Sequence, residues 1–243
     1  MVTPVVLVHG GGFDARCWDL VVPHLAAPAI AVDLPGRGER PADLATVTLA
    51  DCAAAIAEDV DRAGFDDIVL VGHSLAGCSL PGAIGLLGDR VRHAVFVACT
   101  VPEDGTSCFD TLDPEIQAMS QGTGRAAREQ GDQSDPGVMD TAMAKAVFGN
   151  DLDDDRFAWC VERMVPEASQ LIVDTVDLSP LRADTAPLRT WIRTLQDVIL
   201  PPDRQLRFVA NVGDCEVVDL DAGHMCMISR PEATAGLLDR IAG

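Results

Sequence analysis

The stretch that most constrains the fold is an apolar run that leads directly into a turn of small residues. Residues 68–72 read Ile-Val-Leu-Val-Gly, and residues 73–77 follow as His-Ser-Leu-Ala-Gly. A strand that passes at once into a helix holds its turn residue in a strained backbone conformation, which small neighbours accommodate. The pattern predicts that Ser74 stands at the end of a strand with its hydroxyl facing a cleft. Pro81 is expected to kink or shorten the helix that follows.

Further apolar runs alternate with helix-like segments along the chain. An alanine-rich helix is expected from residue 48 to about residue 64, with Thr48 or Asp51 as its cap, and a closing helix at 229–242 with Ser229 as its cap. Near-continuous apolar strands are typical of a parallel sheet covered on both faces, and the strand–helix–strand order favours βαβ units. The predicted fold class is therefore α/β, with a mostly parallel central sheet and helices on both faces. The strands are expected at residues 5–9, 29–32, 68–72, 91–99, 189–194 and 216–220.

The pattern changes between residues 102 and 187, where strand-like apolar runs largely disappear. Glycines between 122 and 137 divide this segment into helical pieces, and residues 156–165 read as one helix after an acidic turn. We therefore expect a helical cap at 102–187, inserted into a sheet domain made of residues 1–101 and 188–243.

The charge balance argues against polyanionic partners. The sequence has 18 basic and 38 acidic residues, which gives a net charge of −20. A surface this acidic repels phosphate backbones and anionic membranes, so neither nucleic acid nor a membrane is expected as a partner. The expected partner is a small-molecule substrate, and a homodimer is one option for the oligomeric state. Lys145 is the single lysine, a bias that favours a GC-rich bacterial genome.

The cysteines and the length of the apolar runs indicate the cellular compartment of the protein. The eight cysteines are scattered without a CxxC pair, which indicates reduced and mostly buried thiols. No apolar run reaches the roughly 18 residues of a transmembrane helix, and the amino-terminal run is too short for a signal peptide. We therefore expect a cytoplasmic protein. No HxH or HExxH spacing indicates a metal site, and no cofactor is expected.

Two motifs complement Ser74. A glycine-rich loop, residues 10–12, follows the first strand, and its N–H groups can approach a substrate oxygen as an oxyanion hole requires. We expect the main-chain amides of Gly11 and Leu75 to be the donors. A phosphate-binding loop is the competing interpretation, but no Lys-Ser/Thr follows the glycines. His224 comes on a loop after the last strand, from which its imidazole can reach Ser74 as a base.

An acidic residue is expected between Ser74 and His224 in the chain. Asp197 comes just after the fifth expected strand, where its carboxylate would accept the proton on the far ring nitrogen of His224. Three other aspartates nearby stay open as alternatives, although their contexts read as helix surface, turn and strand: Asp203, Asp214 and Asp219. A hydroxyl, a carboxylate and an imidazole in this chain order predict acyl transfer, with Ser74 as nucleophile and His224 as general base.

Through these motifs, the sequence resembles the α/β-hydrolase superfamily over nearly its whole length. Within it the chain is similar to a group of small capped esterases and hydroxynitrile lyases, which includes plant methyl-ester esterases and bacterial aryl-ester hydrolases. The resemblance implies the α/β-hydrolase fold, a triad of Ser74, Asp197 and His224, and a cap over a mostly apolar pocket. The matching stretches are VVLVHGGGFDARCW, AVDLPGRG, LVGHSLAG, AVFVACTVPEDG, TWIRTLQDVILPP and VVDLDAGHMCMISRPE.

Two departures from this group separate reaction classes. The lyases carry a lysine directly after the catalytic histidine, where this sequence has Met225, and an early hydroxyl residue, where it has Gly10. The resemblance therefore favours hydrolysis of a carboxylic ester, thioester or lactone of a small, largely apolar molecule. Two alternatives stay open: a cofactor-free lyase or cyclase acting on a secondary metabolite with Ser74 only orienting it, and a non-catalytic ligand-binding module.

Overall fold

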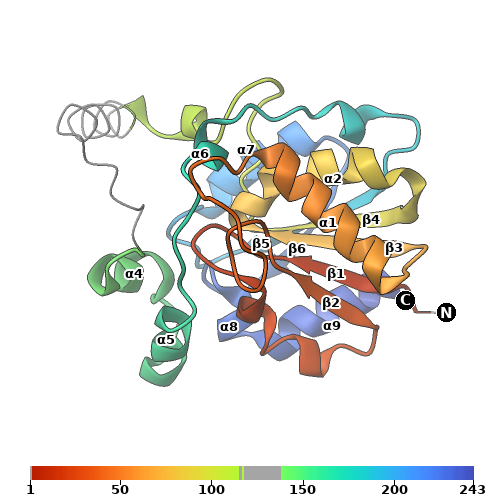
Figure 1. The fold of residues 1–243 in the computed structure, drawn as a ribbon. Coiled ribbons are helices and arrows are strands. Elements are labelled where there is room, and N and C mark those ends of the chain that lie inside the picture. The colour runs from red at the N-terminus through yellow and green to blue at the C-terminus, as the bar shows by residue number, and fades with distance from the viewer. Residues whose placement is uncertain (1, 115–116, 118–137) are drawn as a thin grey trace.

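A six-stranded parallel sheet forms the centre of the computed structural model, which describes residues 2–114, 117 and 138–243 (Figure 1). The strand order is β2-β1-β3-β4-β5-β6, and every neighbouring pair is parallel. The first strand therefore lies inside the sheet, and β2 pairs with it at one edge. The third strand pairs with the other side of β1, and β4, β5 and β6 follow in order to the opposite edge. Such a reversal opens a crevice at the carboxyl ends of β1 and β3, where ligands bind in open α/β sheets. The strands are β1 (Val5–Val8), β2 (Ala29–Val32), β3 (Ile68–His73), β4 (Val91–Val97), β5 (Leu188–Thr194) and β6 (Glu216–Leu220).

The inner strands are apolar along their whole length because both of their faces are covered. In β1, Val6 and Val8 join one buried cluster, while Val5 and Leu7 join the cluster on the opposite face. All four side chains are fully buried. The predicted α/β fold and its strand order along the chain are confirmed, with strand ends that differ by at most two residues.

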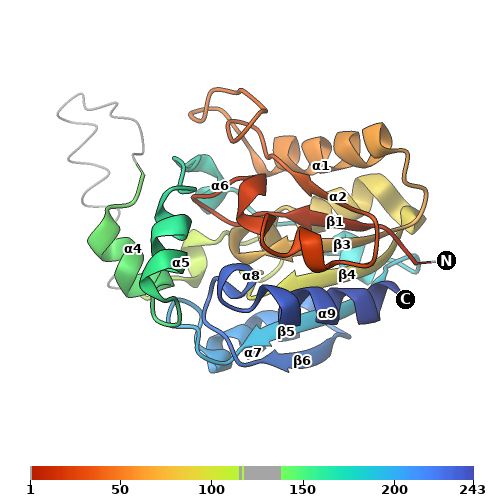
Figure 2. The same cartoon turned by 90° about the horizontal axis from the view of Figure 1, so that it is seen from below.

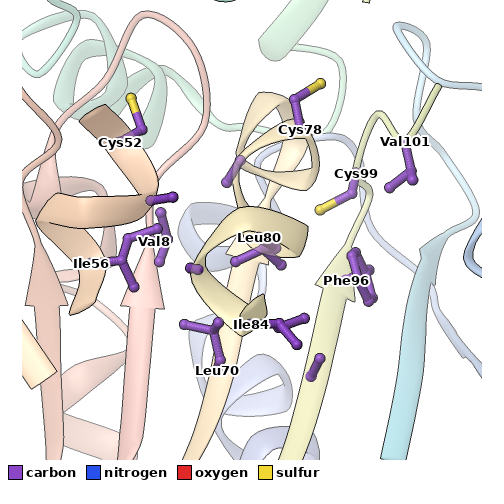
Figure 3. Close-up of a cluster of buried hydrophobic side chains, with 14 of the residues drawn as sticks. Val8, Cys52, Ile56, Leu70, Cys78, Leu80, Ile84, Phe96, Cys99 and Val101 are labelled. Atoms are coloured by element: carbon purple, nitrogen blue, oxygen red, sulfur yellow. The ribbon is translucent and has the colours of Figure 1, made fainter. Parts of the chain in front are cut away.

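Helices cover the two faces of the sheet as separate layers. Figure 3 shows Leu70 and Phe96 of the sheet lying against Leu80 and Ile84, with Ile56 of the neighbouring helix close by. Seen from below, the last helix of the chain crosses the opposite face (Figure 2). On the first face lie α1 (Leu49–Ala63), α2 (Leu80–Leu87) and α7 (Pro202–Val212), and on the second lie α8 (Cys226–Ser229) and α9 (Pro231–Ala242).

The ends of α1 follow from its sequence. The Thr48 hydroxyl accepts a hydrogen bond from the Asp51 N–H at 3.2 Å, and the Asp51 carboxylate accepts one from the Thr48 N–H at 2.9 Å. Gly64 ends the helix with a φ of 68°, a left-handed conformation that glycine adopts at little cost. The two candidate caps therefore act together as one capping box.

Two helix predictions need correction. The segment after Ser74 is a 3₁₀ helix (Ser74–Cys78), and α2 starts only at Leu80, with Pro81 in its first turn, where a missing N–H is harmless. The closing segment is also divided: α8 ends at Ser229, and α9 starts at Pro231. Arg230 rather than Ser229 occupies the cap position of α9, with a φ of −138° that interrupts the helix.

In the segment between β4 and β5, helices α4 (Thr141–Phe148) and α5 (Asp154–Val161) lie beyond the carboxyl ends of the strands (Figures 1 and 2). The described residues of this segment form helices and turns but no strand of the sheet, and the expected helix at 156–165 is shorter and begins earlier. The predicted glycine breaks between 122 and 137 lie outside the described residues, and the division into core and cap stays a prediction. The same segment also contains the short helix α6 (Gln170–Val173).

Two predictions from composition can be compared with the structure. All eight cysteines lie in described parts of the chain; each is a free thiol, and six are buried. Within the described ranges, every helix is too short or too polar to span a lipid bilayer.

Candidate active site

Ser74 occupies the strained turn that its sequence context predicts. It directly follows β3 and has a φ of 53°, which an L-residue rarely adopts. A Cβ atom placed on Gly10 would lie only 2.8 Å from the Ser74 Cβ, and one on Gly77 would lie 2.5 Å from the Thr100 carbonyl oxygen. Glycines at these two positions therefore allow the turn to pack against its neighbouring loops. Ala76 takes the place of the last glycine of the G-x-S-x-G pattern; it is buried and has no positive φ, so it does not need the freedom of glycine.

The structure brings Ser74, His224 and Asp197 together from the ends of three strands. The His224 Nε2 atom lies 2.9 Å from the Ser74 Oγ, and the His224 Nδ1 atom lies 2.7 Å from Asp197 Oδ2. His224 and Asp197 are buried, while the serine is partly exposed. A hydroxyl, an imidazole and a carboxylate are thus joined by two consecutive hydrogen bonds.

Local hydrogen bonds hold the Asp197 carboxylate in its charged form. Its Oδ1 accepts from the N–H groups of Ile199 and Leu200 at 2.9 and 2.8 Å, and the Thr194 hydroxyl donates to Oδ2 at 2.9 Å. Burial on its own raises the pKa of this carboxyl, but the charge and hydrogen bond of His224, together with these donors, lower the pKa below its ordinary value.

The three alternative aspartates do not contact His224. Asp219 forms an exposed ion pair with Arg193, with 2.7 Å between Nε and Oδ1. Asp203 lies in the first turn of α7, and Asp214 lies in the turn before β6. The carboxylate next to His224 is therefore Asp197, the first choice from the sequence.

Two buried histidines support the loops around Ser74. The His73 Nε2 atom donates to the His224 carbonyl oxygen at 3.0 Å, and the two rings lie 4.8 Å apart. Burial lowers the pKa of His73 to about 3, and the neighbouring His224 contributes to this shift. His9 accepts from the Leu34 N–H at 3.2 Å, and burial lowers its pKa to about 4. Both imidazoles are therefore neutral near pH 7.

The loop after β1 and the amino end of the 3₁₀ helix lie next to each other. A Cβ atom on Gly11 would lie 3.2 Å from the Leu75 Cδ2 atom, and both residues line the same pocket as Ser74. The next amide along, that of Gly12, donates to Glu167 Oε2 at 2.9 Å. The juxtaposition of Gly11 and Leu75 is the one an oxyanion hole requires, and their role as donors stays a prediction.

The pocket above Ser74 has a volume of about 370 Å³ and is mostly apolar. The Phe148 ring stacks on the His224 imidazole, with centroids 6.0 Å apart and 23° between the ring planes, and meets Phe13 edge-on at 5.4 Å. A pocket of this size and polarity suits a small, largely apolar molecule. Its other apolar walls include Met139, Met164, Val165, Ile172, Ile199 and Met225.

Sequence reasoning missed two neighbouring residues that hold the loops of Asp197 and His224. The Asn150 side-chain amide donates to the Gln196 carbonyl oxygen at 2.8 Å, and Asp151 Oδ2 accepts from the Gly223 N–H at 2.6 Å. Gln196 directly precedes Asp197, and Gly223 directly precedes His224. In the sequence, residues 151–155 are only an acidic turn, so no local signal could have identified these contacts.

Comparison with known proteins identifies the family of this chain. The family model described as "Alpha/beta hydrolase family" matches residues 5–237. Methylesterase 7 of Arabidopsis thaliana is 29% identical, over 98% of this chain and 95% of its own length. Lipase LipV of Mycobacterium tuberculosis is 27% identical, over 96% of this chain and 91% of its own length. Norfluorocurarine synthase 2 of a Strychnos species is 28% identical, over 93% of this chain and 90% of its own length.

Solved structures show the same fold at lower identity. An extracellular α/β-hydrolase from a Paenibacillus species superposes with a TM-score of 0.84 at 18% identity, covering 99% of both chains. A pyrethroid hydrolase from Sphingobium faniae JZ-2 gives a TM-score of 0.75 at 23% identity, covering 100% of this chain and 98% of the other. Most of these relatives and neighbours are named as esterases, lipases or hydrolases, which supports the prediction of a carboxylic ester hydrolase. On the family match and the shared fold, this chain belongs to the alpha/beta hydrolase family.

Proposed function

We propose that this chain hydrolyses a carboxylic ester of a small, largely apolar molecule through an acyl-enzyme on Ser74. The observation that carries the proposal is the hydrogen-bonded series from the Ser74 hydroxyl through His224 to Asp197, which opens into an apolar pocket. The curated relatives named methylesterase and lipase support this reaction class.

In the first half of the reaction, the Ser74 Oγ forms a bond to the ester carbonyl carbon, and its proton passes to His224 Nε2. The negative charge on the carbonyl oxygen is stabilised by the amides of Gly11 and Leu75. Collapse of this intermediate breaks the bond to the alkoxy oxygen, which leaves as the alcohol with the proton from His224. Asp197 holds the ring in the required tautomer and stabilises its positive charge.

In the second half, a water molecule replaces the alcohol. His224 takes a proton from the water as its oxygen attacks the acyl carbon, and the same imidazole returns that proton to the Ser74 oxygen as the acid leaves. Each turnover therefore consumes one ester and one water and restores the enzyme without a cofactor.

A serine-directed phosphonate and a chromogenic short-chain ester test this proposal together. We expect the phosphonate to label Ser74 stoichiometrically, as read by mass spectrometry of the intact protein and its peptides, and to abolish ester turnover. Ser74→Ala is expected to lower kcat/KM by about 10³-fold or more. A folded wild-type protein that is neither labelled nor active on any ester would contradict the proposal.

A second candidate function rests on the relative named as a synthase. A cofactor-free lyase or cyclase would use His224 as the base, and Ser74 would only orient the substrate. Ser74→Ala would then retain substantial turnover of the true substrate, while His224→Ala would not. Saturable binding of a ligand without any product would instead indicate a non-catalytic binding module.

A further inference from the structure

Glu167 introduces a carboxylate into a mostly apolar pocket. Among the described residues that line the pocket, it is the only acidic side chain, and none is a lysine or arginine. Glu167 lies between α5 and α6, in the segment that joins β4 to β5, and its side chain is 22% exposed. The proposed mechanism gives it no role, so its presence needs a separate explanation.

Both carboxylate oxygens of Glu167 are held in place. Oε2 accepts from the Gly12 N–H at 2.9 Å, and Oε1 accepts from the Ala168 N–H at 2.6 Å. A main-chain bond from the Val165 N–H to the Gly12 carbonyl oxygen at 2.9 Å ties the same two segments together. The carboxylate therefore keeps one orientation relative to the glycine loop beside Ser74.

The counter-charge of Glu167 is Arg37, which lies behind it. The Arg37 guanidinium forms an ion pair with Glu167 Oε1 and is completely buried, and Arg37 does not line the pocket above Ser74. Because an arginine keeps its proton in proteins and an unpaired buried charge is costly, Arg37 requires Glu167 in its ionised form. The pair thus presents its negative end to the pocket and its positive end to the protein interior.

We infer that the Glu167–Arg37 pair selects substrates by charge: esters with a cationic or hydrogen-bond-donating group are favoured, and esters that carry a carboxylate are rejected. This inference rests on the proposed ester hydrolysis. The physical reason is that a second anion in this partly desolvated pocket meets a fixed carboxylate, whose repulsion is only partly cancelled by the more distant guanidinium.

Three isosteric para-nitrophenyl esters test the inference on the wild-type protein. They are the hemiglutarate, which is anionic, a branched alkanoate of the same shape, which is neutral, and the dimethylammonio-alkanoate, which is cationic. We expect kcat/KM to be at least about tenfold lower for the anionic ester than for the neutral one. The cationic ester should be hydrolysed at least as efficiently as the neutral one. Equal kcat/KM for the anionic and neutral esters would overturn the inference.

A paired substitution locates the effect. Arg37→Met with Glu167→Gln removes both charges together, so that no buried guanidinium is left without a partner, and the carboxamide oxygen can still accept from Gly12. We expect the anionic-to-neutral ratio of kcat/KM to rise about tenfold. The matched control, Arg193→Met with Asp219→Asn, removes an ion pair between β5 and β6 and should leave the ratio unchanged. A folded double variant with the wild-type ratio would contradict the inference.

A binding measurement separates this inference from the proposed function. Non-hydrolysable amide analogues of the three esters are titrated calorimetrically into the wild-type protein, with no need for turnover or for a folded variant. If Ser74 is not labelled but the anionic analogue binds about tenfold more weakly than the neutral one, only the hydrolytic mechanism fails. If Ser74 is labelled and all three analogues bind equally well, the inferred charge selection is contradicted and the proposed hydrolysis stands.

Discussion

The two sides of the pocket are built by different means. Ser74, Asp197 and His224 all come within a few residues of a strand end, where the register of the sheet sets their positions. Asp151 and Glu167 come from the segment between β4 and β5 and are held by a few hydrogen bonds to loops. In the proposed mechanism the first side supplies the reacting groups, and the second encloses the substrate. Substitutions of the strand-end residues, or of residues that hold their loops as Asp151 does, should therefore mainly lower kcat. Substitutions of pocket-lining residues on the second side should mainly change KM or selectivity.

The largest effect is expected at Asp197, on the strand-end side. Asp197→Asn leaves the shape of the side chain but removes the charge that fixes the His224 tautomer, so kcat/KM for a short-chain ester should fall by about 10³- to 10⁴-fold. Steady-state kinetics measures the fall, and Asp219→Asn, at an exposed aspartate, is the control that should stay close to wild type. A fall of less than tenfold would show that another group orients the histidine.

Acid should destabilise the folded protein through two buried, neutral histidines at strand ends, His73 and His9. Burial holds the pKa of His73 at about 3 and that of His9 at about 4, against 6.5 for an exposed histidine. Below pH 6.5, His73 and His9 therefore bind protons in the unfolded chain but stay neutral in the folded protein. The free energy of unfolding should fall as the pH drops from 6.5 towards 4.5, with a slope of up to about 2.7 kcal/mol per pH unit from the two histidines.

Urea unfolding at several pH values measures this slope. His73→Gln keeps a donor for the His224 carbonyl oxygen but does not titrate, so it should reduce the slope by up to about 1.4 kcal/mol per pH unit. The variant and the wild type share every other titrating group, which makes their difference specific for His73. An unchanged slope would mean that His73 is protonated in the folded protein.

A smaller effect is expected at Asp151, where the two sides meet. Asp151→Asn weakens the charged hydrogen bond to the Gly223 N–H, and the loop that carries His224 loses part of its anchor. We expect kcat to fall about tenfold with little change in KM, because positioning of the base is lost rather than binding. Asp155→Asn, on an exposed residue of α5, is the matched control. A change confined to thermal stability would contradict the positioning role.

The smallest effect is expected at Phe148, on the enclosing side. Phe148→Leu keeps an apolar wall but loses the ring that stacks on His224. Leucine preserves much of the contact, so kcat/KM for a long-chain ester should change only about threefold, mostly through KM. A series of esters with increasing acyl length measures this. A loss in kcat comparable with that of Asp151→Asn would show that this ring also positions the base.

Much of the strand-end side could be predicted from residues that are close in sequence. The apolar runs located the inner strands β1 and β3 because burial on both faces demands apolar residues throughout, and short β-branched runs located the other four. Small residues around Ser74 indicated its turn, and Asp197 was preferred because it follows a strand directly. The helix ends were less predictable: Ser229 is the residue that local cap preference selects, but it ends α8, and Arg230 precedes α9 without a side-chain cap bond.

The sequence alone determined the α/β class, the strand positions and the three candidate residues at strand ends. These depend on short patterns, since backbone hydrogen bonding and side-chain alternation act over a few residues. Only the tertiary structure decided what faces Ser74 across the pocket. The bond between Gly12 and Glu167 spans 155 residues and that between Asp151 and Gly223 spans 72. Contacts over such separations follow from how the segment after β4 packs over the sheet, and no local periodicity encodes them.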